Sequence, residues 1–209
     1  MKDVLIINAG GFGRNMAVVA KSDPAHGKEW VVRGFLDGRP DLFNIPELPI
    51  LGDPLTYRYQ QPQILVCALG DPKLRRQYVK PLLEQGADFM NLMPDLHLAD
   101  RAHMGLGCLF ERHVSIGADA KLGSFVIVLS NTIIGYDVKI GSYSTIGSFV
   151  FIGGGAQIGQ DVVIHPHATI LPGIKIGEGA IIGAGSVVIG NVPAGVTVFG
   201  NPAKRFKFK

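Results

Sequence analysis

Residues 133–159 read IIGYDVKIGSYSTIGSFVFIGGGAQIG, and every sixth position of this stretch from Ile134 onward is isoleucine. An aliphatic residue keeps the same phase in thirteen consecutive rows. These positions are Ile116, Leu122, Val128, Ile134, Ile140, Ile146, Ile152, Ile158, Ile164, Ile170, Ile176, Ile182 and Val188. An α-helix has a period of 3.6 residues and a half-buried strand a period of 2, so neither explains the spacing. The stretch therefore predicts one short strand and one turn for every six residues.

The residues around each aliphatic position repeat as well. Glycine follows it directly in nine of the rows, and a small or β-branched residue lies four positions after it. We expect the chain to turn at the glycines and to close one triangular coil with every three strands. Each aliphatic side chain then stacks on its equivalent eighteen residues later, which builds a core that no single repeat could form. The phase extends backward, without the glycines, through Phe110, Met104 and Leu98.

The first half of the chain has another pattern. Apolar runs and helical patterns alternate along it, in the order 4–7, 15–21, 31–36, 64–69 and 73–85. This alternation is typical of a small parallel α/β unit. The proline-rich residues 44–54 are predicted to form a loop.

These patterns predict three segments. Residues 1–92 would form a Rossmann-like α/β half-domain, residues 93–193 the repeat domain, and residues 194–209 a basic tail. Four of the last six residues are Lys or Arg.

The composition limits the classes to which the protein can belong. With 47% hydrophobic and 18% charged residues, the chain is neither disordered nor a coiled coil. The net charge is +3, and the last six residues alone carry +4. The rest of the chain is therefore nearly neutral, and no nucleic-acid partner is expected. The apolar run 4–7 is too short for a signal peptide or a membrane span. Cys67 and Cys108 fit no metal or disulfide pattern. We expect a cytoplasmic protein.

A glycine-rich turn follows the first apolar run. Asn8-Ala9-Gly10-Gly11-Phe12-Gly13 has the GxGxxG spacing with Asn8 in place of the first glycine. Small residues there let backbone amides at a helix N-terminus approach a phosphate. Asp37 ends the second apolar run, where a ribose hydroxyl would be held. Only three strands precede the repeats, so a mononucleotide or a nucleotide-linked sugar fits better than NAD. A tight turn without a ligand is the alternative interpretation.

The chain resembles the bacterial sugar O- and N-acetyltransferases, a group that includes the sialic acid, bacillosamine and perosamine acetyltransferases. The resemblance covers nearly the whole chain and rests on the glycine-rich turn, Gly34-Phe35-Leu36-Asp37, Ala68-Leu69-Gly70-Asp71, the thirteen rows and Gly200-Asn201-Pro202-Ala203. It implies a left-handed parallel β-helix, an exception to the usual right-handed crossover. It also implies a homotrimer, with acetyl-CoA in a groove between neighbouring subunits.

The activity implied is transfer of an acetyl group from acetyl-CoA to an amino or hydroxyl group of a nucleotide-activated or surface-polysaccharide sugar. Candidate substrate-binding residues are Gly10, Gly11, Phe12, Gly13, Asp37, Gly38, Gly70 and Asp71. Candidate acetyl-CoA-binding residues are Thr145, Gly154, Gly155, Pro172, Ala184, Gly185 and Lys204. The bare backbone of residues 153–155 could hydrogen-bond a pantetheine arm or be a sharp turn. The basic tail could bind CoA phosphates or be solvated.

One departure from the family concerns the catalytic base. Where the family has His in an Ile-Gly-His-Asp setting, this chain has Ile134-Gly135-Tyr136-Asp137, and a second family His is matched by Thr145. A phenol, with an ordinary pKa near 10, is a poor base. The candidate catalytic residues are therefore Tyr136, Asp137 and, from a neighbouring subunit, His113 as the replacement base. The alternative is a catalytically silent trimeric protein that binds sugar nucleotides.

The remaining histidines have alternative interpretations. His113 and His167 share one column of the repeat, three coils apart, and each could be an ordinary corner residue. His165 and His167 could chelate zinc, as in the hexapeptide-repeat carbonic anhydrases. The sequence supplies no convincing third ligand, so we expect no metal.

Overall fold

The computed structural model describes residues 1–39, 42 and 48–206, and it divides into two compact units, Met1–Pro94 and Asp95–Lys209. We call them the N-terminal unit and the repeat unit. No helix in the described part of the chain is long and apolar enough to cross a membrane.

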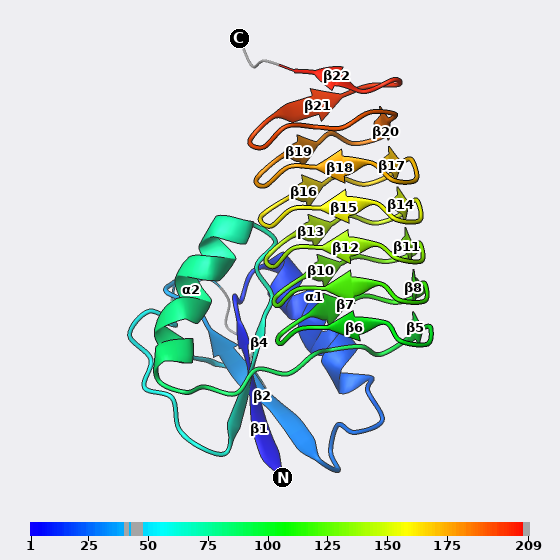
Figure 1. Cartoon of the computed structure of the whole chain (residues 1–209). Coiled ribbons are helices and arrows are strands. Elements are labelled where there is room, and N and C mark those ends of the chain that lie inside the picture. The colour runs from blue at the N-terminus through cyan, green and yellow to red at the C-terminus, as the bar shows by residue number, and fades with distance from the viewer. Residues whose placement is uncertain (40–41, 43–47, 207–209) are drawn as a thin grey trace. The chain divides into compact units, whose positions relative to one another are not determined.

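The N-terminal unit is a four-stranded parallel sheet with two helices (Figure 1). Its elements are β1 (Lys2–Ile7), α1 (Gly11–Lys21), β2 (Trp30–Leu36), β3 (Ile50–Gly52), β4 (Gln63–Cys67) and α2 (Pro72–Glu84). The strand order is β3-β2-β1-β4, so β1 is paired on both sides. Residues 4–7 are buried because β1 is central, which explains their continuous apolar run. The α/β prediction is confirmed.

The proline-rich loop was predicted to run from residue 44 to residue 54. Residues 44–47 lie outside the described part of the chain. The described remainder contains β3, which pairs with β2 at the edge of the sheet. The prediction was wrong here because a strand of three residues is too short to show a hydrophobic period.

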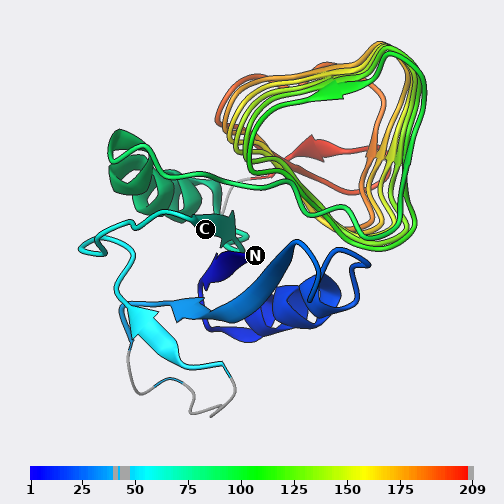
Figure 2. The ribbon, with the colours of Figure 1, turned by 90° about the horizontal axis from the view of Figure 1, so that it is seen from below.

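The repeat unit is a left-handed β-helix whose short strands form three parallel sheets. Sheet I contains β7 (Leu109–Phe110), β10 (Ile127–Val128), β13 (Thr145–Ile146), β16 (Val163–Ile164), β19 (Ile181–Ile182), β21 (Thr197–Phe199) and the antiparallel β22 (Lys204–Arg205). Sheet II contains β5 (Leu96–Leu98), β8 (Val114–Ile116), β11 (Ile133–Ile134), β14 (Phe151–Ile152), β17 (Thr169–Ile170) and β20 (Val187–Val188). Sheet III contains β6 (His103–Met104), β9 (Lys121–Leu122), β12 (Lys139–Ile140), β15 (Gln157–Ile158) and β18 (Lys175–Ile176). Seen along the axis, the coils superpose as a triangle (Figure 2).

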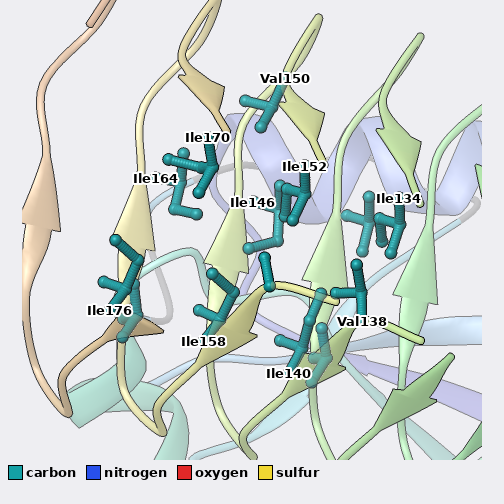
Figure 3. Packing of buried hydrophobic residues seen from close by; sticks show 14 of the residues in the cluster. Ile134, Val138, Ile140, Ile146, Val150, Ile152, Ile158, Ile164, Ile170 and Ile176 are labelled. Atoms are coloured by element: carbon teal, nitrogen blue, oxygen red, sulfur yellow. The ribbon is translucent and has the colours of Figure 1, made fainter. Parts of the chain in front are cut away.

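The six-residue phase corresponds to the core of the β-helix. All thirteen aliphatic residues of the repeat are at most 6% exposed, and the labelled ones point into the interior (Figure 3). Residues four positions later, such as Ala120, Thr132 and Ser144, are also fully buried. The inward pattern is weaker in the row of Leu98, because this residue is 42% exposed. The predicted coil architecture is confirmed.

The predicted position of the turns was wrong. The left-handed backbone conformation occurs three residues after the aliphatic position, for example at Asn131 (φ 60°) and Asp137 (φ 57°), and not at the glycine directly after it. That glycine has a different role. A Cβ on Gly141 would lie 2.4 Å from the backbone nitrogen of Gln160 in the next coil. Glycine is required at Gly141 because the backbones of the two coils approach closely there.

The C-terminal segment continues the β-helix. β21 pairs with β19, and β22 folds back on β21, so residues 197–205 extend sheet I. The segment predicted as a tail from residue 194 therefore contains ordered strands. Its last residues, 207–209, lie outside the described part of the chain.

Candidate active site

In the N-terminal unit, the loops after β1 and β2 meet at the carboxyl edge of the sheet, around Asp37. This residue is 6% exposed. Its Oδ2 accepts a hydrogen bond from the backbone N–H of Ala9 at 2.8 Å. The Arg39 guanidinium donates from Nε to Oδ1 and from Nη2 to Oδ2, both at 2.9 Å, and the Arg39 backbone N–H donates to Oδ1 at 3.0 Å. The Asp37 carboxylate thus ties the two loops together.

Asn8 makes a second tie, to the loop after β4. Its Nδ2 donates to the carbonyl oxygen of Ala68 at 2.7 Å, and its Oδ1 accepts from the backbone N–H of Gly10 at 2.9 Å. Asn8 adopts a left-handed conformation (φ 90°), which asparagine tolerates better than most residues. Three strand-end loops are therefore joined where ligands of parallel α/β sheets bind.

The ionisation of Asp37 depends on its partners. Burial alone raises the pKa of Asp37, but the hydrogen bonds from Arg39 and from the Ala9 N–H lower it more, so the pKa lies below its usual value. A ribose hydroxyl would have to share carboxylate oxygens that already accept four hydrogen bonds, and the ribose contact stays a prediction. Arg39 was not singled out from the sequence, because its pairing with Asp37 depends on the loop conformation.

We expect Asp37→Asn to lower the free energy of unfolding of the N-terminal unit by about 1–3 kcal/mol at pH 7, since charge-assisted hydrogen bonds are lost. The folded-state pKa is depressed, so this stabilisation is present above the unfolded pKa of about 3.9 and is lost as the pH falls through the folded value. Denaturation of both proteins between pH 3 and pH 7 checks this. Asp3→Asn, at the exposed Asp3–Arg33 pair, is the control and should cost less than about 1 kcal/mol. A difference that does not decrease between pH 7 and pH 3 would contradict the prediction.

The glycines of the turn divide into two kinds. A Cβ on Gly13 would lie 1.7 Å from the carbonyl oxygen of Asn8, so packing requires this glycine. A Cβ on Gly11 or Gly70 would meet no atom within 4 Å, so both border open space. Asp71 caps α2, because its Oδ1 accepts from the backbone N–H of Leu74 at 2.9 Å.

The remaining candidates in the N-terminal unit flank this edge. Phe12 lies in the first turn of α1. Gly38 lies beside Asp53, whose Oδ2 is 3.3 Å from the position of an added Cβ.

In the repeat unit, the candidate residues lie at two corners on opposite edges of sheet II. The corner between sheets II and III carries Tyr136, Asp137, Gly154, Gly155 and Pro172. The corner between sheets I and II carries His113, Ala184 and Gly185, while Thr145 lies in β13 of sheet I and Lys204 in β22. One copy of the chain therefore does not bring Tyr136 and His113 together.

Tyr136 covers part of the backbone that was predicted to be bare. A Cβ on Gly154 would lie 2.6 Å from the Tyr136 ring, so the ring packs directly over this glycine. The Gly155 N–H donates to the Tyr136 carbonyl oxygen at 2.9 Å, and the Gly154 carbonyl oxygen accepts from Gly173 at 3.0 Å. The Tyr136 side chain is nevertheless exposed, with 64% of the residue accessible. The pantetheine contact at residues 153–155 stays a prediction.

His113 is oriented by a carboxylate. Its Nδ1 lies 2.9 Å from Oδ2 of Asp95, and both side chains are exposed. A carboxylate at one imidazole nitrogen fixes the ring and leaves the other nitrogen, Nε2, to exchange a proton with a substrate. Asp95 was missed because it precedes the glycine-containing rows. His167 differs, because its ring stacks on Phe149 with centroids 4.9 Å apart.

Neither cysteine is placed to act as a nucleophile. Burial raises the pKa of Cys67 to about 12. Cys108 is also fully buried, and its Sγ lies 3.2 Å from the carbonyl oxygen of Gly123. Within the described residues, no three His, Cys, Asp or Glu side chains are close enough to hold a metal ion.

Comparisons with known proteins match both units. The pattern of the PglD N-terminal domain matches residues 3–82, and the bacterial transferase hexapeptide pattern (six repeats) matches residues 119–154 and 155–190. A sequence comparison with curated proteins finds no significant match.

Solved structures match nearly the full length. The acetyltransferase domain of PglB from Neisseria gonorrhoeae, in complex with acetyl coenzyme A, is 26% identical with a TM-score of 0.90, covering 98% of this chain and 99% of that chain. PerB from Caulobacter crescentus, in complex with CoA and GDP-perosamine, is 26% identical with a TM-score of 0.87, covering 99% and 98%. A histidine-to-alanine variant of the Caulobacter crescentus GDP-perosamine N-acetyltransferase, also with both ligands, is 26% identical with a TM-score of 0.88, covering 100% and 98%. With a PglD-type N-terminal domain followed by a left-handed β-helix, this chain belongs to the hexapeptide-repeat sugar acetyltransferases.

Proposed function

We propose that the protein transfers an acetyl group from acetyl-CoA to an amino group of a nucleotide-linked sugar. The observation that carries this is the match of both units, over nearly the whole chain, to acetyltransferases solved with acetyl-CoA or with CoA and GDP-perosamine. The N-terminal unit would hold the nucleotide and the repeat unit the acetyl-CoA. We expect an enzyme with such substrates to act in the cytoplasm.

The chemistry requires a base but no covalent enzyme intermediate. The neutral amine attacks the thioester carbonyl carbon, the C–N bond forms, and the C–S bond then breaks to release CoA thiolate. The attacking nitrogen loses a proton to the base, and the thiolate takes up a proton. Direct transfer is consistent with two buried cysteines. An amine is a better acceptor than a hydroxyl here, since it needs no deprotonation before attack.

The base in this proposal is His113 of a neighbouring subunit, oriented by Asp95. Tyr136 and Asp137, at the corner between sheets II and III, would line the acceptor side of the same site. The candidate acetyl-CoA-binding residues at the corner between sheets II and III of one subunit would then face those at the corner between sheets I and II of its neighbour. Lys204, exposed in β22, would lie near the CoA phosphates.

We expect the protein to be a homotrimer. Ile133 and Phe151 are exposed side by side on the outer face of sheet II, and Phe149 is exposed at the adjoining corner. Light scattering should give three times the 22.4 kDa mass of the chain. Phe151→Glu should shift the mass toward the monomer, because a carboxylate would be buried without a partner. A monomer at micromolar concentration for the unaltered chain would contradict the prediction.

The function is tested by acetyl transfer and not by ligand binding. The histidine variant noted above was solved with both ligands, so binding alone does not separate an enzyme from a silent binding protein. Purified protein is mixed with acetyl-CoA and a panel of GDP- and UDP-linked amino sugars, GDP-perosamine included, and CoA thiol release is followed with product mass. A mass increase of one acetyl group supports the proposal. Binding of both substrates without transfer across the panel would favour the silent alternative.

A further inference from the structure

We propose that Arg39 recognises the diphosphate of the nucleotide-linked substrate at the carboxyl edge of the N-terminal sheet. The proposal rests on the proposed function, and it adds a specificity-determining residue that the sequence pattern does not single out. The Arg39 side chain is 60% exposed although Asp37 holds it from one side.

The contacts of the Arg39 guanidinium leave part of it available. Nε and Nη2 bond to the Asp37 carboxylate at 2.9 Å each, and Nη2 also lies 3.4 Å from Oδ1 of Asn8. These bonds do not use Nη1, which carries two further donors. The Asp37 oxygens are nearly buried, so the guanidinium is held on a fixed base while its outer edge faces solvent. A cation ordered in this way loses little conformational entropy when an anion binds it.

The surroundings of Arg39 offer room for a ligand. Arg39 reaches the Asn8 side chain, which joins the loops after β1 and β4. Gly11 and Gly70, in those two loops, both border open space. Among the described residues, Asp37 is the carboxylate that bonds to the Arg39 side chain, and it accepts from Nε and Nη2. A second anion can therefore bond to Nη1. A lysine would hold two anions less rigidly, because its ammonium group lacks the fixed planar fork of the guanidinium.

The test compares nucleotides that differ only in phosphate content. Titration calorimetry measures GDP, UDP, guanosine and uridine against unaltered protein and Arg39→Gln, at low and at moderate salt. We expect Arg39→Gln to weaken binding of the preferred diphosphate by about 10- to 100-fold and to leave the nucleoside within twofold. The salt dependence of diphosphate binding should also fall. Affinity for acetyl-CoA, which has its own diphosphate, should not change.

Two further variants control for structure. Arg33→Gln removes an arginine that also pairs with an aspartate, since its Nε lies 2.8 Å from Oδ1 of Asp3, and it should bind GDP and UDP like unaltered protein. Asp37→Asn combined with Arg39→Gln removes both charges of the pair, so its loss of diphosphate affinity cannot come from an unpaired buried carboxylate. Circular dichroism confirms folding of each variant.

The outcomes separate this inference from the proposed function. If GDP or UDP binds and both Arg39 variants keep that affinity within twofold, Arg39 is not the recognition group while the proposed function stands. If neither GDP nor UDP binds unaltered protein, the result contradicts both the proposed nucleotide-linked acceptor and the proposed role of Arg39.

Discussion

Replacing His113 with alanine is expected to lower kcat for acetyl transfer by about 10²- to 10⁴-fold, the usual contribution of a positioned base. The KM for acetyl-CoA should change little, because His113 accepts a proton and does not bind the thioester in this proposal. Steady-state kinetics with the amino sugar that gives transfer measures both quantities.

The contact between His113 and Asp95 makes the prediction sharper. Asp95→Asn keeps the size of the side chain and removes the charge that orients Nδ1. Asp95 is a positioning residue in this proposal, so Asp95→Asn should lower kcat by about tenfold, which is less than the effect of His113→Ala, and should leave the KM for acetyl-CoA little changed. His103→Ala replaces an exposed histidine of β6, which lies in sheet III and not in sheet II, and should leave the rate unchanged.

Variants at the other corner test the alternative assignment. Tyr136→His restores the side chain of the family pattern. If it raises the rate and His113→Ala does not lower it, the base lies at position 136 and the site has diverged from the family. Asp137→Ala measures any contribution of the carboxylate next to Tyr136. A His113→Ala enzyme with full activity would exclude the proposed base.

The sequence predicted the repeat unit well because one physical requirement recurs in every row. An aliphatic residue must fill the core once per strand, and that requirement produced an unbroken period from Ile116 to Val188. Two residue patterns recur with the same six-residue period at the corners: glycines directly after the aliphatic position, and residues in the left-handed conformation two positions later. The glycines were wrongly predicted to mark the turn. The glycines avoid a clash with the next coil, whereas the left-handed residues include Asp119, Asn131 and Asp161. Asn and Asp at fixed spacing could have located the turns.

The site was less predictable because its residues meet through loops. Asp37 was found from its place after β2, but Arg39 becomes relevant only once the loop folds it back onto that carboxylate. Likewise, Asp95 lies eighteen residues before His113, and only the coil geometry brings the two together. The Asp37–Arg39 pair leaves no period or motif in the sequence. The eighteen-residue spacing of Asp95 and His113 equals one coil, so counting back one coil from His113 could have found Asp95.

The second large effect is expected in the core of the repeat unit. Ile182→Ala should lower the free energy of unfolding by about 2–5 kcal/mol, the cost of leaving a cavity in a packed interior. Ile182 is fully buried, and its equivalent one coil earlier, Ile164, points into the interior among the neighbouring isoleucines (Figure 3). A β-helix relaxes poorly around such a cavity, because each coil is fixed by hydrogen bonds to the coils on both sides.

The neighbouring residue provides a matched control in the same strand. Ile181 points out of sheet I and is 36% exposed, so Ile181→Ala removes the same atoms with less loss of buried surface and should cost less than about 1 kcal/mol. Denaturant unfolding is followed at one fixed chain concentration, since a trimer gains apparent stability with concentration. Equal costs at the two positions would mean that the inward phase of the repeat is misassigned. A large cost at Ile182 alone would show that the six-residue pattern carries the stability of the β-helix, because the two variants differ only in the side of the strand from which the atoms are removed.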